Sequence, residues 1–312
     1  MRFRHSHLFS TYSIVARDPD TGQLGVAVQT HQMCVGSVVP WLLPGRGAFA
    51  TQSVANISFG PMALIMLREG VSAPNIIKAL AASDPDAHRR QMAVVDANGE
   101  AAAWTGDGCI AQASHHVGQG YSVQANMMTQ ATVVAAMARA YENADGDLAQ
   151  RMLAALEAAQ AEDGDIRGMQ SAALKVVPGD PSKPIWASDY DLRVDEHENP
   201  VQELGRLVRL GRAQQIDGEG YRLFEDQKLD EALAKWAEAR RIAPELEELP
   251  FWQAMALADG PANVAAAVEI LKSALMHDPR REHWVDLIRR LQDCGLLERA
   301  GAADELISAL GR

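Results

Sequence analysis

The sequence predicts an α+β fold in which two antiparallel sheets pack face to face with helices on their outer surfaces, followed by an all-α region. Two observations predict it. Residues 11–213 read as strands, two helices, strands, two helices and strands, which differs from the regular strand–helix alternation of a doubly wound sheet. From about Ile216 the composition changes to helix-forming residues, which predicts the all-α region.

The first predicted hairpin occupies residues 11–30. Pro19 fixes φ and Gly22 accepts a positive φ, so residues 19–22 suit a tight turn. The second strand, Leu24 to Val28, is apolar nearly throughout, which is typical of a strand covered on both faces. Because side chains alternate along a strand, the first strand has two expected faces, Tyr12, Ile14 and Ala16 on one and Thr11, Ser13 and Val15 on the other.

The next segments supply the first pair of helices. Residues 31–44 are apolar but interrupted by Gly36, Pro40 and Pro44, which predicts a loop. A strand is expected over residues 47–55. Two helices are expected over residues 62–69, ending at Gly70, and from a cap at Ser72 to about Ala82.

The middle of the chain carries the clearest turn signal. Asn98-Gly99 between two apolar runs predicts a hairpin of residues 91–96 and 100–105. The spacing of apolar residues and the composition predict the elements that follow. These are strands 110–115 and 120–126, helices 132–143 and 147–160, and a loop at 164–168. Strands 171–177 and 190–194 and a helix from Pro200 to about Arg212 come next.

An internal repeat organises the C-terminal region. The repeat has four positions, and each recurs 35 residues later. Ala232, Trp236, Ala239 and Pro244 correspond to Ala267, Leu271, Ala274 and Pro279. The pattern resembles the tetratricopeptide repeat of about 34 residues, with one extra residue in the turn at residues 258–261. Two repeats and a closing helix over residues 282–291 are fewer than usually stand alone, so we expect this region to dock on the first domain or a partner. A peptide-binding groove and an ordinary helical appendage both remain open.

Composition excludes several classes of function. The net charge of −12 argues against a nucleic-acid surface, and no apolar run is long enough to span a membrane. The three cysteines, Cys34, Cys109 and Cys294, lack the spacing of a metal site, and no phosphate loop is present, so we expect neither metal nor cofactor. Because the N-terminus lacks the apolar run of a secretory signal, the expected location is the cytoplasm.

The hydroxyls at the start of the first strand are the first catalytic candidates. A Thr or Ser that becomes N-terminal can use its own α-amino group as the base for its side chain. Thr11 is the leading nucleophile and Ser13, on the same face, is the reserve. The alternative for such a hydroxyl is a local hydrogen bond at a strand end.

Residues 11–213 resemble DUF1028, a bacterial family of unknown function placed in the N-terminal-nucleophile (Ntn) hydrolase-like superfamily. The resemblance rests on the segments at residues 11–18, 24–29, 35–41, 50–52, 56–60, 121–126 and 164–173. It implies a four-layer αββα sandwich. Members often begin Met-Thr, so that loss of Met exposes the Thr matching Thr11. Here residues 1–10 form a leader, and a free amine at Thr11 requires cleavage after Ser10.

Further residues are candidates for the predicted site. Asn56 and Asn126 could donate to an oxyanion, or could instead cap a helix or a turn. His31 could stand in for the Lys of some Ntn enzymes, or lie solvated in a loop. Asp165 and Arg167 could orient a substrate carboxylate or lock their loop. The remaining candidate substrate-binding residues are Gln52, Gln170 and Ser171.

Two functions follow from these predictions. The first is an Ntn-type amidohydrolase that acts on a small amide or peptide through Thr11. The second is a catalytically inactive protein of the same fold that binds a protein or a peptidoglycan fragment through its TPR-like domain, residues 216–312. That domain resembles the segment labelled peptidoglycan-binding in longer family members. Either protein could form a homo-oligomer.

Overall fold

The structure, a computed structural model, describes residues 8–9, 11–259, 263–275 and 278–311. The chain folds into two compact units, residues 1–208 and 209–312. The boundary between them falls within one continuous helix, α5 (Pro200–Glu225). Each unit has its own hydrophobic cores and is described by itself.

The first unit contains two antiparallel sheets, as predicted. Sheet A has the order β1-β5-β6-β7, and β4 also pairs with β5. Its strands are β1 (Leu8–Phe9), β4 (Pro40–Leu43), β5 (Gly47–Val54), β6 (Arg90–Asp96) and β7 (Ala101–Thr105). Sheet B has the order β11-β10-β3-β2-β9-β8. Its strands are β2 (Thr11–Arg17), β3 (Leu24–Thr30), β8 (Ser114–Gly118), β9 (Tyr121–Asn126), β10 (Ser171–Val177) and β11 (Tyr190–Val194).

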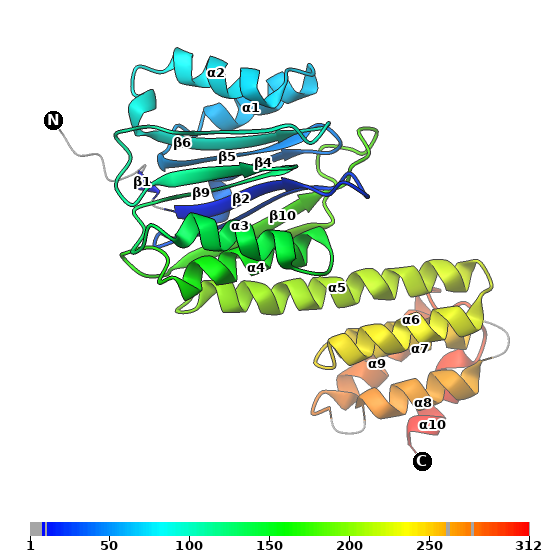
Figure 1. Ribbon diagram of the computed structural model, residues 1–312. Coiled ribbons are helices and arrows are strands. Elements are labelled where there is room, and N and C mark those ends of the chain that lie inside the picture. The colour runs from blue at the N-terminus through cyan, green and yellow to red at the C-terminus, as the bar shows by residue number, and fades with distance from the viewer. Residues whose placement is uncertain (1–7, 10, 260–262, 276–277, 312) are drawn as a thin grey trace. The chain divides into compact units, whose positions relative to one another are not determined.

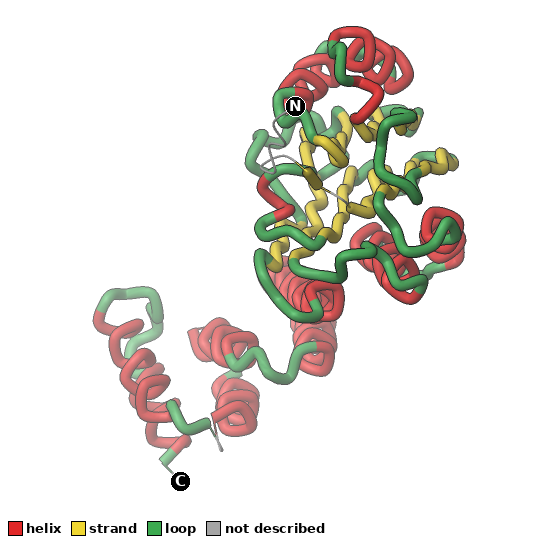
Figure 2. The backbone as a smooth tube through the Cα atoms, turned by 90° about the vertical axis from the view of Figure 1, so that its left-hand side faces the viewer, coloured by secondary structure: helices red, strands yellow, loops and turns green. Residues whose placement is uncertain are grey.

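The two sheets face each other and helices cover their outer faces (Figures 1 and 2). Helices α1 (Phe59–Arg68) and α2 (Ala73–Ser83) pack on sheet A through a core that includes Phe49 and Ile76. Helices α3 (Val133–Asn143) and α4 (Leu148–Ala161) pack on sheet B through a core that includes Ile14 and Met152. A third core, which includes Val15, Val26 and Val95, fills the space between the sheets.

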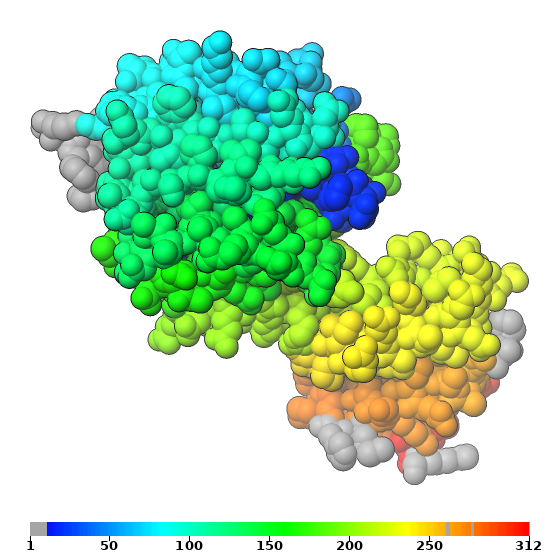
Figure 3. Space-filling view, viewed as in Figure 1, coloured from blue at the N-terminus to red at the C-terminus, as the bar shows by residue number. Residues whose placement is uncertain are grey.

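The predicted faces of β2 are confirmed by these cores. Tyr12, Ile14 and Ala16 belong to the core under α3 and α4, whereas Val15 belongs to the core between the sheets. The turn between β2 and β3 contains Gly22 with φ of 73°. The atoms of this turn are visible at the surface in blue in Figure 3, whereas β2 itself is buried up to Ala16.

Three of the predicted elements differ markedly from the structure. The loop predicted at residues 31–44 contains a short 3₁₀ helix (Val35–Ser37) and β4, which pairs with β5 and buries Leu42. The strand predicted at 110–115 begins only at Ser114, since the carbonyls of Ile110 and Gln112 accept from Met127 and Met128 outside a regular ladder. The helix predicted to end near Arg212 continues to Glu225.

The second unit is helical, as its composition predicts. After α5 it contains α6 (Leu229–Ile242), α7 (Glu248–Asp259), α8 (Val264–Leu275), α9 (Arg281–Asp293) and α10 (Ala302–Leu310). Five of the repeated positions are fully buried, namely Ala232, Trp236, Ala239, Ala267 and Leu271. Trp236 lies beside Gly220, where a Cβ would stand 2.4 Å from the Trp236 ring. Part of the turn predicted at 258–261 lies outside the described residues.

Candidate active site

Polar side chains gather at one end of the space between the sheets. The strand register places Ser171, Thr30, Thr11 and Asn126 in one row across β10, β3, β2 and β9. Sheet A presents the paired residues Gln52, Gln91 and Thr105 from β5, β6 and β7. All of these except Thr105 are buried. The inter-sheet space is therefore polar at this end and apolar in the core that contains Val15.

Hydrogen bonds join five buried polar residues at this end into one cluster across the two sheets. We call this cluster the amide network; it consists of Ser13, Gln52, Gln91, Gln124 and Asn126. The Ser13 hydroxyl donates to Gln52 Oε1 and accepts from Gln124 Nε2, both at 2.6 Å. Gln91 Oε1 accepts from Gln52 Nε2 and Asn126 Nδ2, both at 2.8 Å. The network thus ties β2 and β9 of sheet B to β5 and β6 of sheet A.

Thr11 lies next to the amide network at the first position of β2. Its carbonyl oxygen accepts from Gln52 Nε2 at 3.2 Å and from Asn126 Nδ2 at 3.4 Å. Its side chain is fully buried. The structure therefore brings together four of the predicted residues, Thr11, Ser13, Gln52 and Asn126, with two amide donors on one carbonyl.

A short strand leads into Thr11 from the opposite sheet. Leu8 and Phe9 of β1 pair with Val54 and Ser53 of β5 in sheet A, and β2 of sheet B begins at Thr11. The described residues before and after Ser10 therefore belong to different sheets. The rest of the predicted leader, residues 1–7 and Ser10, lies outside the described residues.

The amide network extends outward to a histidine. Gln91 Nε2 donates to Thr105 Oγ1 at 2.9 Å, and that hydroxyl is 2.8 Å from His115 Nδ1. Thr105, Cys109 and His115 line a surface cavity of about 460 Å³. Partial burial and the charge of His116 lower the pKa of His115, and burial raises the pKa of the Cys109 thiol. At neutral pH both groups are therefore uncharged.

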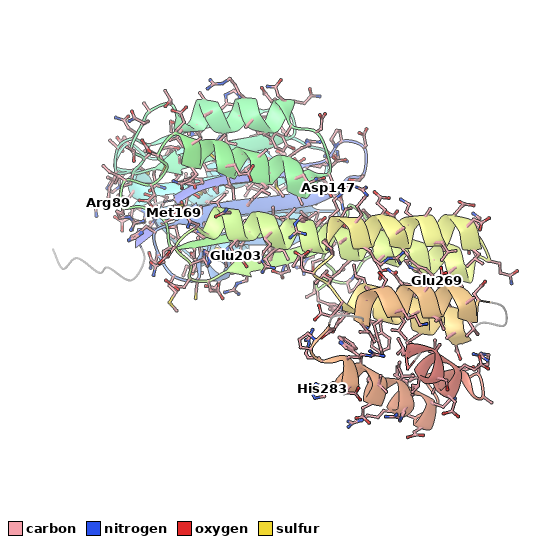
Figure 4. The ribbon with its side chains drawn as sticks, turned by 90° about the horizontal axis from the view of Figure 1, so that it is seen from below. Arg89, Asp147, Met169, Glu203, Glu269 and His283 are labelled. Atoms are coloured by element: carbon pink, nitrogen blue, oxygen red, sulfur yellow. The ribbon has the colours of Figure 1, made fainter. Side chains whose placement is uncertain are left out.

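The other predicted binding residues form a second group beside β3 and β10. Asp165 accepts from the Arg167 guanidinium at 2.8 Å and from the backbone N–H of His31 at 3.2 Å. His31 Nδ1 lies 3.2 Å from the carbonyl oxygen of Met169. Figure 4 labels Met169 and Asp147 at opposite ends of the first unit. Within this group the Asp165 carboxylate holds the loop at residues 164–168, one of its two predicted roles.

Two more predicted residues complete this second group. The Ser171 hydroxyl donates to the carbonyl of Gln32 at 2.5 Å and accepts from the backbone N–H of Val35 at 3.1 Å. The backbone N–H of Gln170 donates to the carbonyl of Thr30. These bonds fix the segment after β3 against β10, and they are separate from the bonds that build the amide network.

Asn56 lies apart from both groups. It stands between β5 and α1, where Oδ1 accepts from the backbone N–H of Ser58 and Nδ2 donates to Asp84 at 3.3 Å. Asp84 also pairs with Arg90 at 2.9 Å. Asn56 therefore has the turn-bonding role that was the alternative to an oxyanion donor.

Gln91 and Gln124 belong to the site but were not among the predicted site residues. Ser122, Gln124 and Asn126 alternate with Tyr121, Val123 and Ala125, a pattern that usually indicates one solvated face. Here both faces of β9 are buried. One signal in the sequence could have identified Gln91 and Gln124. Both belong to strands that are otherwise apolar enough to be covered on both faces, so their amide side chains are expected to be buried and hydrogen-bonded.

Two further properties of the described part of the chain concern metals and membranes. Within the described residues, no group of three or more His, Cys, Asp or Glu side chains could hold a metal ion. No helix in the same residues is long and apolar enough to cross a membrane.

Comparison with known proteins locates the first unit among its relatives. Residues 11–204 match the model of DUF1028, described as a family of unknown function. The crystal structure of protein SPO2555 from Silicibacter pomeroyi, itself assigned to DUF1028, matches with 32% sequence identity and a TM-score of 0.58. That match covers 64% of this chain and 88% of the other. No curated protein matches the sequence.

Proposed function

Because this chain belongs to the DUF1028 family, whose function is unknown, we propose its function from the site itself. It is an amide hydrolase of the N-terminal-nucleophile type, and Thr11 is its nucleophile. The observation that carries this proposal is the place of Thr11: the first residue of a central strand, between two sheets, beside buried amide donors. The family match also begins at Thr11.

The proposal includes an interpretation of both units. The sheets and helices of residues 11–213 are a four-layer αββα sandwich of the Ntn type, and residues 216–312 are a TPR-like domain. The packing of α1 and α2 on sheet A and of α3 and α4 on sheet B supports the first interpretation. The buried repeat positions Trp236 and Leu271 support the second.

Activation requires hydrolysis of the peptide bond between Ser10 and Thr11. One water molecule is consumed, the carboxyl group remains on Ser10, and the amine remains on Thr11. This amine is the base that the site needs, because the side chains of the amide network are neutral amides and a hydroxyl. An α-amino group with a pKa near 8 is partly unprotonated at neutral pH, and burial lowers that pKa further.

The amides beside Thr11 would stabilise the charge that develops during the reaction. Donors held in place before the reaction are effective because they need no reorganisation in the transition state. The network holds Gln52 and Asn126 through Gln91, and it holds Ser13 through Gln124. Ser13 is therefore a positioning residue in this proposal, with both of its hydrogen bonds directed to glutamines.

An acylating probe directed at hydroxyl groups tests the nucleophile. We expect labelling of the wild-type protein and of Thr11→Ser, which retains a hydroxyl. Labelling is lost in Thr11→Val, which keeps the β-branched shape without the hydroxyl. Equal labelling of the wild type and Thr11→Val would rule out Thr11, provided that circular dichroism shows both proteins folded.

A second candidate is a protein that keeps this fold without the chemistry. The observation that favours it is the hydrogen bonding of the amide network, whose groups are already engaged with one another. Such a protein would act through its helical unit, by binding a protein or a peptidoglycan fragment. Absence of labelling from every form of the chain, including one that begins at Thr11, would support this candidate.

A further inference from the structure

The helical unit contains a cavity of about 740 Å³, within the range typical of ligand-binding pockets. Its walls come from the C-terminal half of α5, from α7 with the residues before it, and from the end of α9 with the loop that follows. The helices α6 and α8 contribute none of the described residues that line it. The cavity thus lies on the side of the unit formed by alternate helices.

The walls of the cavity are mostly apolar and aromatic. Leu249 and Met255 line it as buried residues, whereas Trp252 and Leu296 are 40% and 73% exposed. Large apolar side chains that remain this exposed around a hollow are typical of a surface covered by another molecule. An aromatic residue at such a place is a common energetic centre of a protein interface.

The charged groups of the cavity all carry the same sign. Four carboxylates line it, those of Asp217, Glu247, Glu248 and Asp259, and none of the described lining residues is basic. Neighbouring groups engage three of them: Arg280 pairs with Glu247, Gln253 donates to Asp217 at 2.6 Å, and the backbone N–H of Arg299 donates to Asp259 at 2.7 Å. Glu248 has no ion pair among the described residues.

A polar group in the wall also lacks a partner. The hydroxyl oxygen of Tyr221, a residue that lines the cavity, is buried and has no hydrogen-bond partner among the described residues. A buried polar group without a partner costs free energy, so such groups in native proteins call for an explanation. An acceptor on a bound molecule, such as a peptide carbonyl, would satisfy this hydroxyl.

From these observations we propose that the cavity is the docking site for a peptide segment of a partner protein that carries a lysine or arginine between apolar side chains. The apolar residues enter beside Trp252 and Met255, and the cation pairs with Glu248. A backbone carbonyl of the peptide accepts from Tyr221. Apolar walls strengthen the attraction of the carboxylates for the cation, which favours a basic peptide over a neutral one. The proposal does not depend on the chemistry of Thr11.

Fluorescence anisotropy with labelled synthetic peptides and the full chain tests this proposal. The probe has Leu-Lys-Leu at its centre and Gly-Ser repeats on both sides; its comparators have Leu-Glu-Leu or Ser-Lys-Ser there. We expect the Leu-Lys-Leu peptide to bind and each comparator to bind about tenfold more weakly or not at all. Equal binding of the three peptides, or no binding of any, would overturn the proposal.

Three variants with matched controls locate the binding to the cavity. Glu248→Gln and Trp252→Ala should each weaken binding of the Leu-Lys-Leu peptide by about tenfold. The controls are Glu269→Gln and Trp186→Ala, which should leave the peptide affinity unchanged. Glu269, labelled in Figure 4, is an exposed residue of α8, and Trp186 is an exposed residue of the first unit. Unchanged binding to Glu248→Gln and Trp252→Ala would place the peptide elsewhere.

Tyr221→Phe, the third variant, separates binding from folding. Removing a hydroxyl without a partner should leave the unfolding midpoint unchanged or raise it, whereas peptide affinity should fall several-fold. This variant remains informative even if Trp252→Ala fails to fold. Full affinity in Tyr221→Phe would contradict the role given to this hydroxyl.

Discussion

At the scale of single residues, the most unusual feature is a set of buried amides between two sheets. Each glutamine of the amide network occupies an inward position where an apolar residue would ordinarily pack. Burying such groups is tolerable only because they bond to one another and to backbone carbonyls. Removing one member takes a hydrogen bond from more than one of the others, so the network is more sensitive to substitution than any one hydrogen bond.

Gln91→Leu should therefore destabilise the first unit by about 3 kcal/mol, since it removes the amide oxygen that accepts from both Gln52 and Asn126 and the amide nitrogen that donates to Thr105 and to the carbonyl of Ala125. The matched control is Gln119→Leu at an exposed position, for which we expect a change within about 0.5 kcal/mol. Urea unfolding measures both. Equal effects of the two substitutions would mean that the network contributes little to stability.

Part of this site could be predicted from the sequence. Thr11 and Ser13 share the inward face of β2 because side chains alternate along a strand, which the hairpin pattern alone specifies. Gln52 and Asn126 also lie at the predicted site. Gln91 and Gln124 could not be identified in the same way, because their roles depend on the contact between sheets A and B. That contact is tertiary, and no local period encodes it.

At the scale of elements, the turn between β2 and β3 is fixed to helix α4. Asp18 accepts from the backbone N–H groups of Asp20 and Thr21 and pairs with Arg151 of α4 at 3.2 Å. Burial raises the pKa of Asp18, but these hydrogen bonds and the charge of Arg151 outweigh it, so that its pKa lies below the ordinary value. The ionised carboxylate therefore stabilises the fold.

Asp18→Asn should reduce the dependence of stability on acid pH. A carboxyl whose pKa is lower in the folded state contributes stability above its unfolded pKa, near 3.9, and loses it as pH falls through the folded pKa. The wild type should thus lose more stability than Asp18→Asn between about pH 4 and the folded pKa. Thermal unfolding at several pH values measures this, with exposed Asp20→Asn as the control. Parallel curves for the wild type and Asp18→Asn would contradict it.

The elements that sequence predicted well are those with strong local signals. The turn residues Asn98-Gly99 and the cap Asp147, which forms a capping box with Gln150, fix β6, β7 and α4 close to their predicted ends. The segment Pro40–Leu43 is too short for its period to indicate a strand, and it is one only because β5 lies beside it. For this segment, pairing with a neighbouring strand determines the secondary structure, and local sequence preference does not.

At the scale of the whole molecule, the two units have separate hydrophobic cores. Helix α5 contributes Val201, Leu204 and Val208 to the core under sheet B, and Ala213 and Ile216 to a core of the helical unit. The change of composition near Ile216 lies close to the start of the second unit's core, but it does not coincide with the end of α5, which continues to Glu225. Backbone hydrogen bonding continues along α5 because both halves are buried, each by its own unit.

Trp236→Ala should destabilise only the helical unit. Trp236 is fully buried and its ring contacts those of Tyr221 and Phe224, so we expect a loss of about 4 kcal/mol. Calorimetry of the full chain should show one unfolding transition lowered and another unchanged. Trp186→Ala, at an 80% exposed position, should alter neither transition. A uniform shift of the whole unfolding curve by Trp236→Ala would mean that the units unfold together.

The central claim is that Thr11 becomes an N-terminal nucleophile, and the mass of the intact protein tests it most directly. The active protein should have the mass of a chain that begins at Thr11, and Edman sequencing should return Thr-Tyr-Ser-Ile-Val. A chain that still carries Ser10 and nevertheless accepts the acylating probe at Thr11 would contradict the claim, because its α-nitrogen would remain in a peptide bond and could not act as the base.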